Sequence, residues 1–126
     1  MKFQSDDASG VNLISRHEAG AVWVGGARHA GSVLVPWVGA VQPWPAAVLE
    51  DLAAAHFEAV AAQAPEVVIF GSGVRLRFAP PALMRALIER RIGVETMDTG
   101  AACRTYNVLA SEGRRVLAAL LLPPLP

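Results

Sequence analysis

The sequence predicts an α/β layered domain with a β-hairpin in front of it. From residue 46 onward, segments with helical spacing alternate with short apolar runs rich in β-branched residues. Before residue 46, β-rich runs are separated by glycines and followed by a proline-rich extended stretch. The chain has 126 residues, of which 53% are hydrophobic and 17% charged, which suits one domain with a sizeable core. We therefore expect a single domain over 1–126, loosely ordered over 1–10 and ending in a tail over 122–126.

The hairpin is predicted from two apolar runs, 21–24 and 32–35, which flank the glycine-rich stretch G-G-A-R-H-A-G. A further short strand is expected over 11–14. The polar residues 16–18 that follow it are expected to form a turn, which places His17 in solvent.

The alternating part of the chain begins with apolar residues on one helical face, at Val48, Leu52, Ala55 and Ala59. The short run V-V-I-F then has the pattern of a buried parallel strand, which is covered on both faces. The predicted elements are, in order, a helix over 46–63, a strand over 67–70, a helix over 80–91, a strand over 94–97, a helix ending near 112 and a strand over 115–121.

Composition argues against several classes of protein. The net charge is zero, with 11 basic and 11 acidic residues and no long basic run, so we expect no nucleic-acid partner. One cysteine forms neither an internal disulfide nor a cysteine-rich zinc site, and no histidines have ligand spacing, so no metal or cofactor is expected. The start of the chain lacks an apolar leader, and no apolar run approaches the roughly 20 residues of a membrane span. We therefore expect a cytoplasmic protein with no membrane span.

The stretch M-D-T-G at 97–100 contains the triplet of aspartic proteases, enzymes in which two aspartates share one proton. In those enzymes the triplet lies in all-β structure, and an apolar-apolar-Gly segment follows it. Here a helical pattern follows, and the matching segment, Ile69-Phe70-Gly71, comes earlier in the chain. We therefore interpret Asp98 or Thr99 as a helix cap, which contributes about 1 kcal/mol.

Cys103 lies beside Arg104, as an activated thiol does near a cation. Neighbouring side chains on a helix point about 100° apart, however. Cys103 then shares a face with Ala102, Tyr106, Leu109 and Ala110, and Arg104 points elsewhere. This spacing favours a small buried core cysteine over a nucleophile.

One candidate ligand site emerges from the order of the elements. If strands 67–70 and 94–97 are parallel, the loop after the first and the helix start after the second lie at the same end of the sheet, where α/β proteins bind ligands. Backbone N–H groups and a helix N-terminus there favour an anion. The candidate ligand-binding residues are Gly71, Ser72, Gly73, Asp98, Thr99 and Arg104.

Three stretches of the chain resemble a known domain family. They are V-W-V-G-G-A-R-H-A-G-S-V-L-V-P, P-E-V-V-I-F-G-S-G-V-R-L-R-F-A-P-P and G-V-E-T-M-D-T-G-A-A-C-R-T-Y-N-V-L-A-S-E-G-R-R-V-L-A-A-L-L. The family is of largely unknown function and includes the mitochondrial respiratory complex I assembly factor 3 proteins and an adipogenesis-associated human relative. The G-[ST]-G loop and the M-D-T-x-x-A-C-R-T-Y-N segment are its most specific motifs. The family often has Ala where this chain has Gly100.

The resemblance implies three layers. A mixed central β-sheet is flanked by helices, the N-terminal β-hairpin packs on one layer, and the last strand runs antiparallel. It implies no established catalytic activity, since the mitochondrial relatives act in assembling a membrane enzyme complex through contacts with other proteins.

Two functions stay open at this point. One is a non-catalytic protein-interaction or assembly-factor-like role, with other proteins as partners. The other is binding of a small, anionic molecule, with or without catalysis, between the 71–73 loop and the helix start at 98–100.

Overall fold

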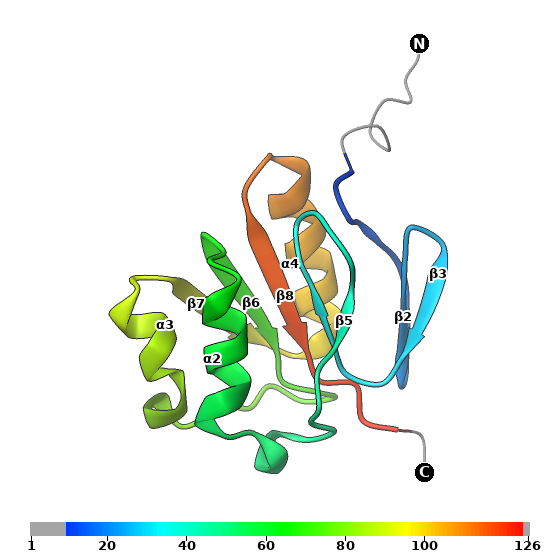
Figure 1. Ribbon diagram of the computed structural model, residues 1–126. Helices are drawn as coiled ribbons and strands as arrows, with labels where there is room; N and C mark the ends of the chain where they lie inside the picture. The colour runs from blue at the N-terminus through cyan, green and yellow to red at the C-terminus, as the bar shows by residue number, and fades with distance from the viewer. Residues whose placement is uncertain (1–9, 125–126) are drawn as a thin grey trace.

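The computed structural model describes residues 10–124, and Figure 1 shows them arranged in three layers. The predictions for 1–9 and 125–126 lie outside these residues. One sheet holds β1 (Ile14–Glu18), β2 (Ala21–Val24) and β3 (Ala27–Ala30), in that order. The central sheet has the order β5 (Gln42–Pro43), β4 (Val33–Val35), β8 (Val116–Leu120), β6 (Val67–Gly71) and β7 (Gly93–Met97). The helices are α2 (Ala54–Ala62), α3 (Arg85–Glu89) and α4 (Thr99–Ser111), with 3₁₀ turns η1 (Leu49–Asp51) and η2 (Pro81–Met84).

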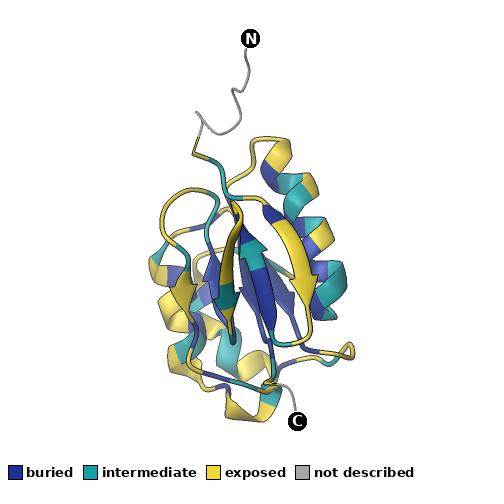
Figure 2. Cartoon of the chain, turned by 90° about the vertical axis from the view of Figure 1, so that its right-hand side faces the viewer, coloured by how far each residue is buried: buried dark blue, intermediate teal, exposed yellow. Residues whose placement is uncertain are grey.

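The three middle strands of the central sheet, β4, β8 and β6, are buried on both faces, and Figure 2 shows buried residues concentrated on strands. Helices α2 and α3 cover one face, and α4 together with the three-stranded sheet covers the other. All five residues of β8 are buried, and alternate residues enter the two cores. The predicted three-layered α/β fold with a mixed central sheet is therefore confirmed.

The direction of the last strand needs a correction. Strand β8 runs antiparallel to β4, as predicted, but parallel to β6 on its other side. Because β6 is also parallel to β7, helix α4 is a crossover that returns the chain to the same end of the sheet before β8 begins. The 13 residues of α4 span about 20 Å, enough for that return. The antiparallel component of the sheet therefore comes from β4 and β5.

The N-terminal hairpin does not pair residues 21–24 with 32–35, as was predicted. Strand β2 pairs with β3 through a tight turn at Gly25 and Gly26, whose φ angles are +58° and +85°. Positive φ at both central residues is typical of the two-residue hairpin turn. Residues 33–35 instead join the central sheet, and residues 16–18 belong to β1 rather than to a turn. The strand predicted over 11–14 therefore begins at its last residue, Ile14.

The first predicted helix is interrupted by local side-chain bonds. The carboxylate of Asp51 accepts hydrogen bonds from the backbone N–H groups of Ala47 and Val48, which closes η1. The ring of His56 accepts one from the N–H of Ala53, where α2 begins. Such bonds compete with continuous helix. The second predicted helix likewise divides into η2 and α3.

Candidate functional site

The loop after β6 and the start of α4 meet at the carboxyl end of the parallel strands, as predicted. The backbone N–H of Gly73 donates to Oγ1 of Thr99 at 2.9 Å, and the N–H of Thr99 donates to the carbonyl of Gly73 at 2.9 Å. The Thr99 hydroxyl donates in turn to the carbonyl of Leu121 at 2.8 Å. Thr99 is 3% exposed, so its polar atoms join the loop at Gly73 to the chain at Leu121 instead of facing solvent.

Ser72 organises the loop itself. Its hydroxyl donates to the carbonyl of Arg75 at 2.7 Å and accepts from the N–H of Arg77 at 3.0 Å, and its own N–H donates to the carbonyl of Met97. The preceding residue, Gly71, lies so close to α4 that an added Cβ would be 3.0 Å from the Cα of Thr99. Gly71 and Ser72 therefore have structural roles: Gly71 allows the close approach of α4, and Ser72 closes the loop. These roles explain why the loop begins with Gly-Ser.

Asp98 is the N-cap of α4. Its Oδ1 accepts a hydrogen bond from the N–H of Ala101 at 2.9 Å, which satisfies one free donor of the first turn. The capping interpretation of the Asp98-Thr99-Gly100 triplet is confirmed.

Cys103 is a buried core residue, as its helical spacing predicted. It is 4% exposed and belongs to the core cluster of Ala102, Tyr106 and Ala110. Burial raises the pKa of the Cys103 thiol to about 11, and the nearby Arg104 offsets this only in part. The thiol is therefore protonated at neutral pH, which argues against a nucleophile.

A cleft of about 290 Å³ opens beside the corner, between the β1–β2 turn, the start of α4 and residues 121–123. Gly73, Asp98 and Thr99 line it, together with His17 and Gly100. A second hollow, between β1 and α4, shares His17 and Gly100 with the cleft and is lined by Arg104. Of the predicted site residues, the cleft thus collects Gly73, Asp98 and Thr99, with Arg104 adjoining.

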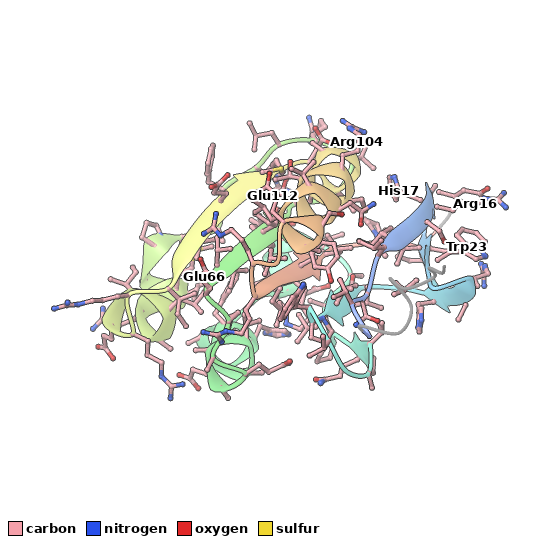
Figure 3. All side chains as sticks on the ribbon, turned by 90° about the horizontal axis from the view of Figure 1, so that it is seen from above. Arg16, His17, Trp23, Glu66, Arg104 and Glu112 are labelled. Carbon is pink, nitrogen blue, oxygen red and sulfur yellow. The ribbon has the colours of Figure 1, made fainter. Side chains whose placement is uncertain are left out.

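Three polar side chains converge around Gly100. A Cβ built there would lie 3.4 Å from Oδ1 of Asp98, 3.5 Å from Cε1 of His17 and 3.7 Å from Nη1 of Arg104. Figure 3 shows His17 on β1 and Arg104 on α4 as neighbours. Sequence reasoning missed His17, because 15–18 are all exposed and show no strand alternation. Its approach to α4 depends on tertiary packing.

Ser72 faces a different hollow, of about 160 Å³, on the other side of Gly73. This hollow is lined by η1 residues and by the loop after β6, including Val74, Arg75 and Arg77. Three large apolar side chains of the loop are exposed: Val74 by 88%, Leu76 by 54% and Phe78 by 70%. Residues 74–78 form a loop without strand pairing.

Within residues 10–124, no three or more His, Cys, Asp or Glu side chains gather as metal ligands do. Nor does any helix in this part of the chain have the length and apolar character needed to cross a membrane. Fold and site together define a small three-layered α/β domain whose strand-end polar groups are bonded within the domain itself.

Comparison with known proteins gives the family. The chain belongs to the protein family of unknown function DUF498/DUF598, whose model matches residues 14–121. The family resemblance expected from the sequence is thereby confirmed, since relatives that match the chain are named NADH dehydrogenase [ubiquinone] 1 alpha subcomplex assembly factor 3.

One such assembly factor, from Bos taurus, is 46% identical over 59 residues, which cover 47% of this chain and 32% of the relative. The match thus spans about a third of that relative's length. An uncharacterised protein of Rhodobacter capsulatus is 37% identical over 118 residues, covering 94% of this chain and 89% of the relative. A crystal structure of a Bordetella parapertussis protein has a TM-score of 0.85 at 37% identity and covers 91% of this chain and 98% of that one.

Proposed function

We propose that this protein is a non-catalytic protein-interaction protein of the assembly-factor kind. The observation that carries the proposal is the contrast between the polar and the apolar side chains where the chain leaves β6. The polar groups of Ser72 and Thr99 are bonded internally, whereas Val74, Leu76 and Phe78 face solvent. Large apolar side chains grouped on a surface are typical of contacts with another protein.

The relatives support the same proposal. A relative that matches this chain over 59 residues is named as an assembly factor, which favours an assembly role here as well. The match covers 32% of that relative. The buried thiol of Cys103 offers no nucleophile at neutral pH. In this proposal the protein acts in the cytoplasm; that location and the lack of a nucleic-acid partner and of a cofactor remain predictions from the sequence.

Affinity capture of the tagged chain from its native cell tests the proposal. We expect one or a few proteins to be recovered in amounts comparable to the bait and to exchange with untagged chain added as competitor. Recovery of nothing above the level of an unrelated bait would contradict an interaction role.

A second candidate function is binding of a small anion in the cleft. The guanidinium of Arg104 and the ring of His17, which both approach Gly100 at the start of α4, favour it. In this proposal Gly73 and Thr99 form the wall, and Gly71 and Ser72 hold that wall in place. Titration with inorganic phosphate, followed by amide NMR shifts, tests it. Saturable shifts at Gly73 and Gly100 that are lost in Arg104→Gln are expected, and their absence at millimolar phosphate would count against an anion site.

A further inference from the structure

The loop after β6 presents a surface that combines apolar side chains with arginines, and we call residues 74–78 the 74–78 surface. Its apolar members, Val74, Leu76 and Phe78, alternate with Arg75 and Arg77. Aromatic and arginine side chains are enriched where proteins contact one another, and they contribute a large share of the binding free energy there. Composition therefore distinguishes this loop from an ordinary polar loop.

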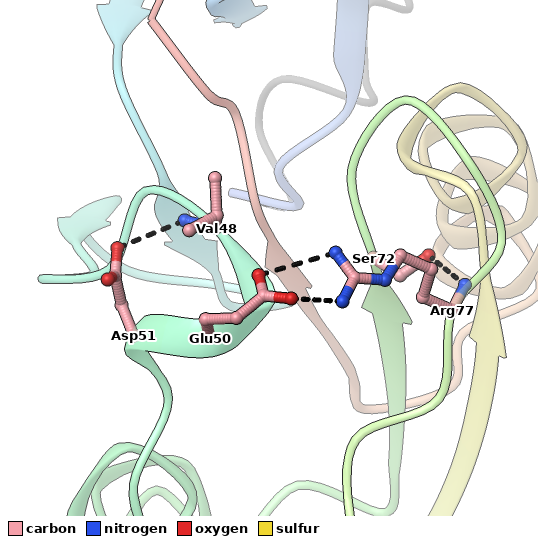
Figure 4. A network of polar contacts seen from close by, with 5 residues as sticks. All are labelled: Val48, Glu50, Asp51, Ser72 and Arg77. Atoms are coloured by element: carbon pink, nitrogen blue, oxygen red, sulfur yellow. Dashed lines mark hydrogen bonds and ion pairs between the residues drawn. The ribbon is translucent and has the colours of Figure 1, made fainter.

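The backbone of the 74–78 surface is held in place by the buried side chain of Ser72. The Ser72 hydroxyl, 5% exposed, bonds to the carbonyl of Arg75 and the N–H of Arg77, so the loop is closed on a buried anchor. Figure 4 shows the bond between the Ser72 hydroxyl and the backbone N–H of Arg77, and the guanidinium of Arg77 reaching the carboxylate of Glu50 on η1. A loop already fixed in one conformation loses less entropy when a partner binds. The apolar side chains are thus held outward by the fold.

The loop and its neighbours in the sequence carry only positive charge. Between residues 67 and 88 there are three arginines and no aspartate, glutamate or lysine. Glu50 pairs with Arg77, a contact that lowers the pKa of Glu50 and raises that of Arg77. Arg75 is exposed and has no ion pair among the described residues. The free charge of the surface is therefore positive.

A hollow of about 160 Å³ adjoins Arg75, lined on its apolar side by Val48, Leu49, Val74 and Pro123. An apolar side chain entering it would lie beside Arg75, whose guanidinium has no ion pair among the described residues. The arginine fork binds a carboxylate through two parallel hydrogen bonds, which fixes the carboxylate's position as well as its charge. The hollow and Arg75 together suit an apolar residue with an acidic neighbour.

From these observations we infer that the 74–78 surface docks an acidic, apolar segment of a partner protein. Apolar side chains of that segment pack on Val74, Leu76 and Phe78, and a carboxylate pairs with Arg75. This inference rests on the proposed interaction function and names the chemistry of the partner. A second copy of this chain fits less well, because two-fold pairing of the surface would set arginine against arginine. An anionic membrane fits less well, because Arg77 is turned back to Glu50 and the hollow has a defined shape.

Site-specific photo-crosslinking in the native cell locates the contact. A benzoylphenylalanine is placed at position 78 and, as a matched control, at position 108, because Val108 on α4 is also an exposed apolar residue, at 56%. We expect position 78 to capture a protein through a segment that contains both acidic and apolar residues. Capture at position 108 alone would overturn this inference and leave the interaction function standing. Capture at neither position, with no partner recovered by affinity capture, would overturn both.

Selection from a random peptide display library against the purified chain tests the chemistry. Wild-type chain should select peptides that combine Asp or Glu with apolar residues. Arg75→Glu should bind those peptides about tenfold more weakly, as expected for the loss of one close charge pair, while Arg91→Glu makes the same charge change elsewhere and should bind them as wild type does. Selection of basic peptides, or equal losses in the two variants, would overturn the inference.

Vesicles of phosphatidylcholine with phosphatidylglycerol distinguish the membrane from a protein. We expect the chain to stay unbound when such vesicles are floated. Flotation with the vesicles that is lost in Phe78→Ser would assign the surface to anionic lipid and overturn a protein partner.

Discussion

The start of α4 and the loop after Gly73 differ in which groups they leave without a partner inside the fold. At the start of α4, polar groups of Thr99 and Asp98 are bonded within the fold. In the loop after Gly73, the large apolar side chains of Val74 and Phe78 are exposed to solvent. The polar residues at 98–100, which look like a functional motif in the sequence, thus have a structural role. The exposed apolar surface belongs to residues 74–78 instead. Side chains that have no partner inside the fold, rather than a polar composition, indicate where another protein binds.

The largest effect on the structural side is expected in thiol reactivity. With the pKa of Cys103 raised from 9.0 to about 11, the thiolate fraction below pH 9 falls about 100-fold. Alkylation by iodoacetamide at pH 8 should therefore be at least about 100-fold slower in the folded chain than in urea. It should rise with pH until about pH 11. Equal rates in the folded and unfolded chains would show that the α4 core is open.

Thr99→Val is expected to cause the largest loss of stability at the corner. It keeps the shape but leaves the buried N–H of Gly73 and carbonyl of Leu121 without their partner, at a cost of about 2–3 kcal/mol. Urea unfolding measures it. Thr105→Val, also on α4 and without a side-chain hydrogen bond among the described residues, is the control and should change stability by less than about 0.5 kcal/mol. Equal effects of the two changes would contradict the structural role of Thr99.

Gly71→Ala tests the close approach of β6 to α4. The new Cβ would lie 3.0 Å from backbone of Thr99, which has no freedom to move aside, so a loss of about 1–3 kcal/mol is expected. Gly93→Ala, on the edge strand β7, meets Val67 at an ordinary 3.9 Å and serves as the control. The melting temperature should fall for the first variant only; a fall in both would assign the effect to glycine replacement in general.

Asp98→Ala should cost about 1 kcal/mol, because the N–H of Ala101 loses its cap. Asp98→Asn keeps an acceptor oxygen at the N-cap and should lose little. Urea midpoints of the two variants make the comparison, and an equal loss in both would point to the charge of Asp98 rather than to its cap.

The sequence predicts best where one pattern has one structural solution. The run 67–70 between breakers became β6, and the spacing of Ala102, Cys103, Tyr106 and Ala110 became the buried face of α4. Prediction failed where local or tertiary bonds decide. Asp51 and His56 interrupt the first helix through bonds to backbone, and the exposed β3 shows no apolar alternation. The position of His17 beside Gly100 depends on how β1 packs against α4, which no local pattern records.

Partner recovery by variants of the exposed loop tests whether the 74–78 surface is where the partner binds. Leu76→Ser and Phe78→Ser are combined, and partner recovery from the native cell is compared with wild type and with Val108→Ser, alongside the urea midpoint of each chain. All three replaced residues are exposed, so stability should stay within about 0.5 kcal/mol of wild type in every variant. We expect the double variant to lose its partner and Val108→Ser to keep it. Undiminished recovery by a folded double variant would contradict the assignment of the interaction to the 74–78 surface.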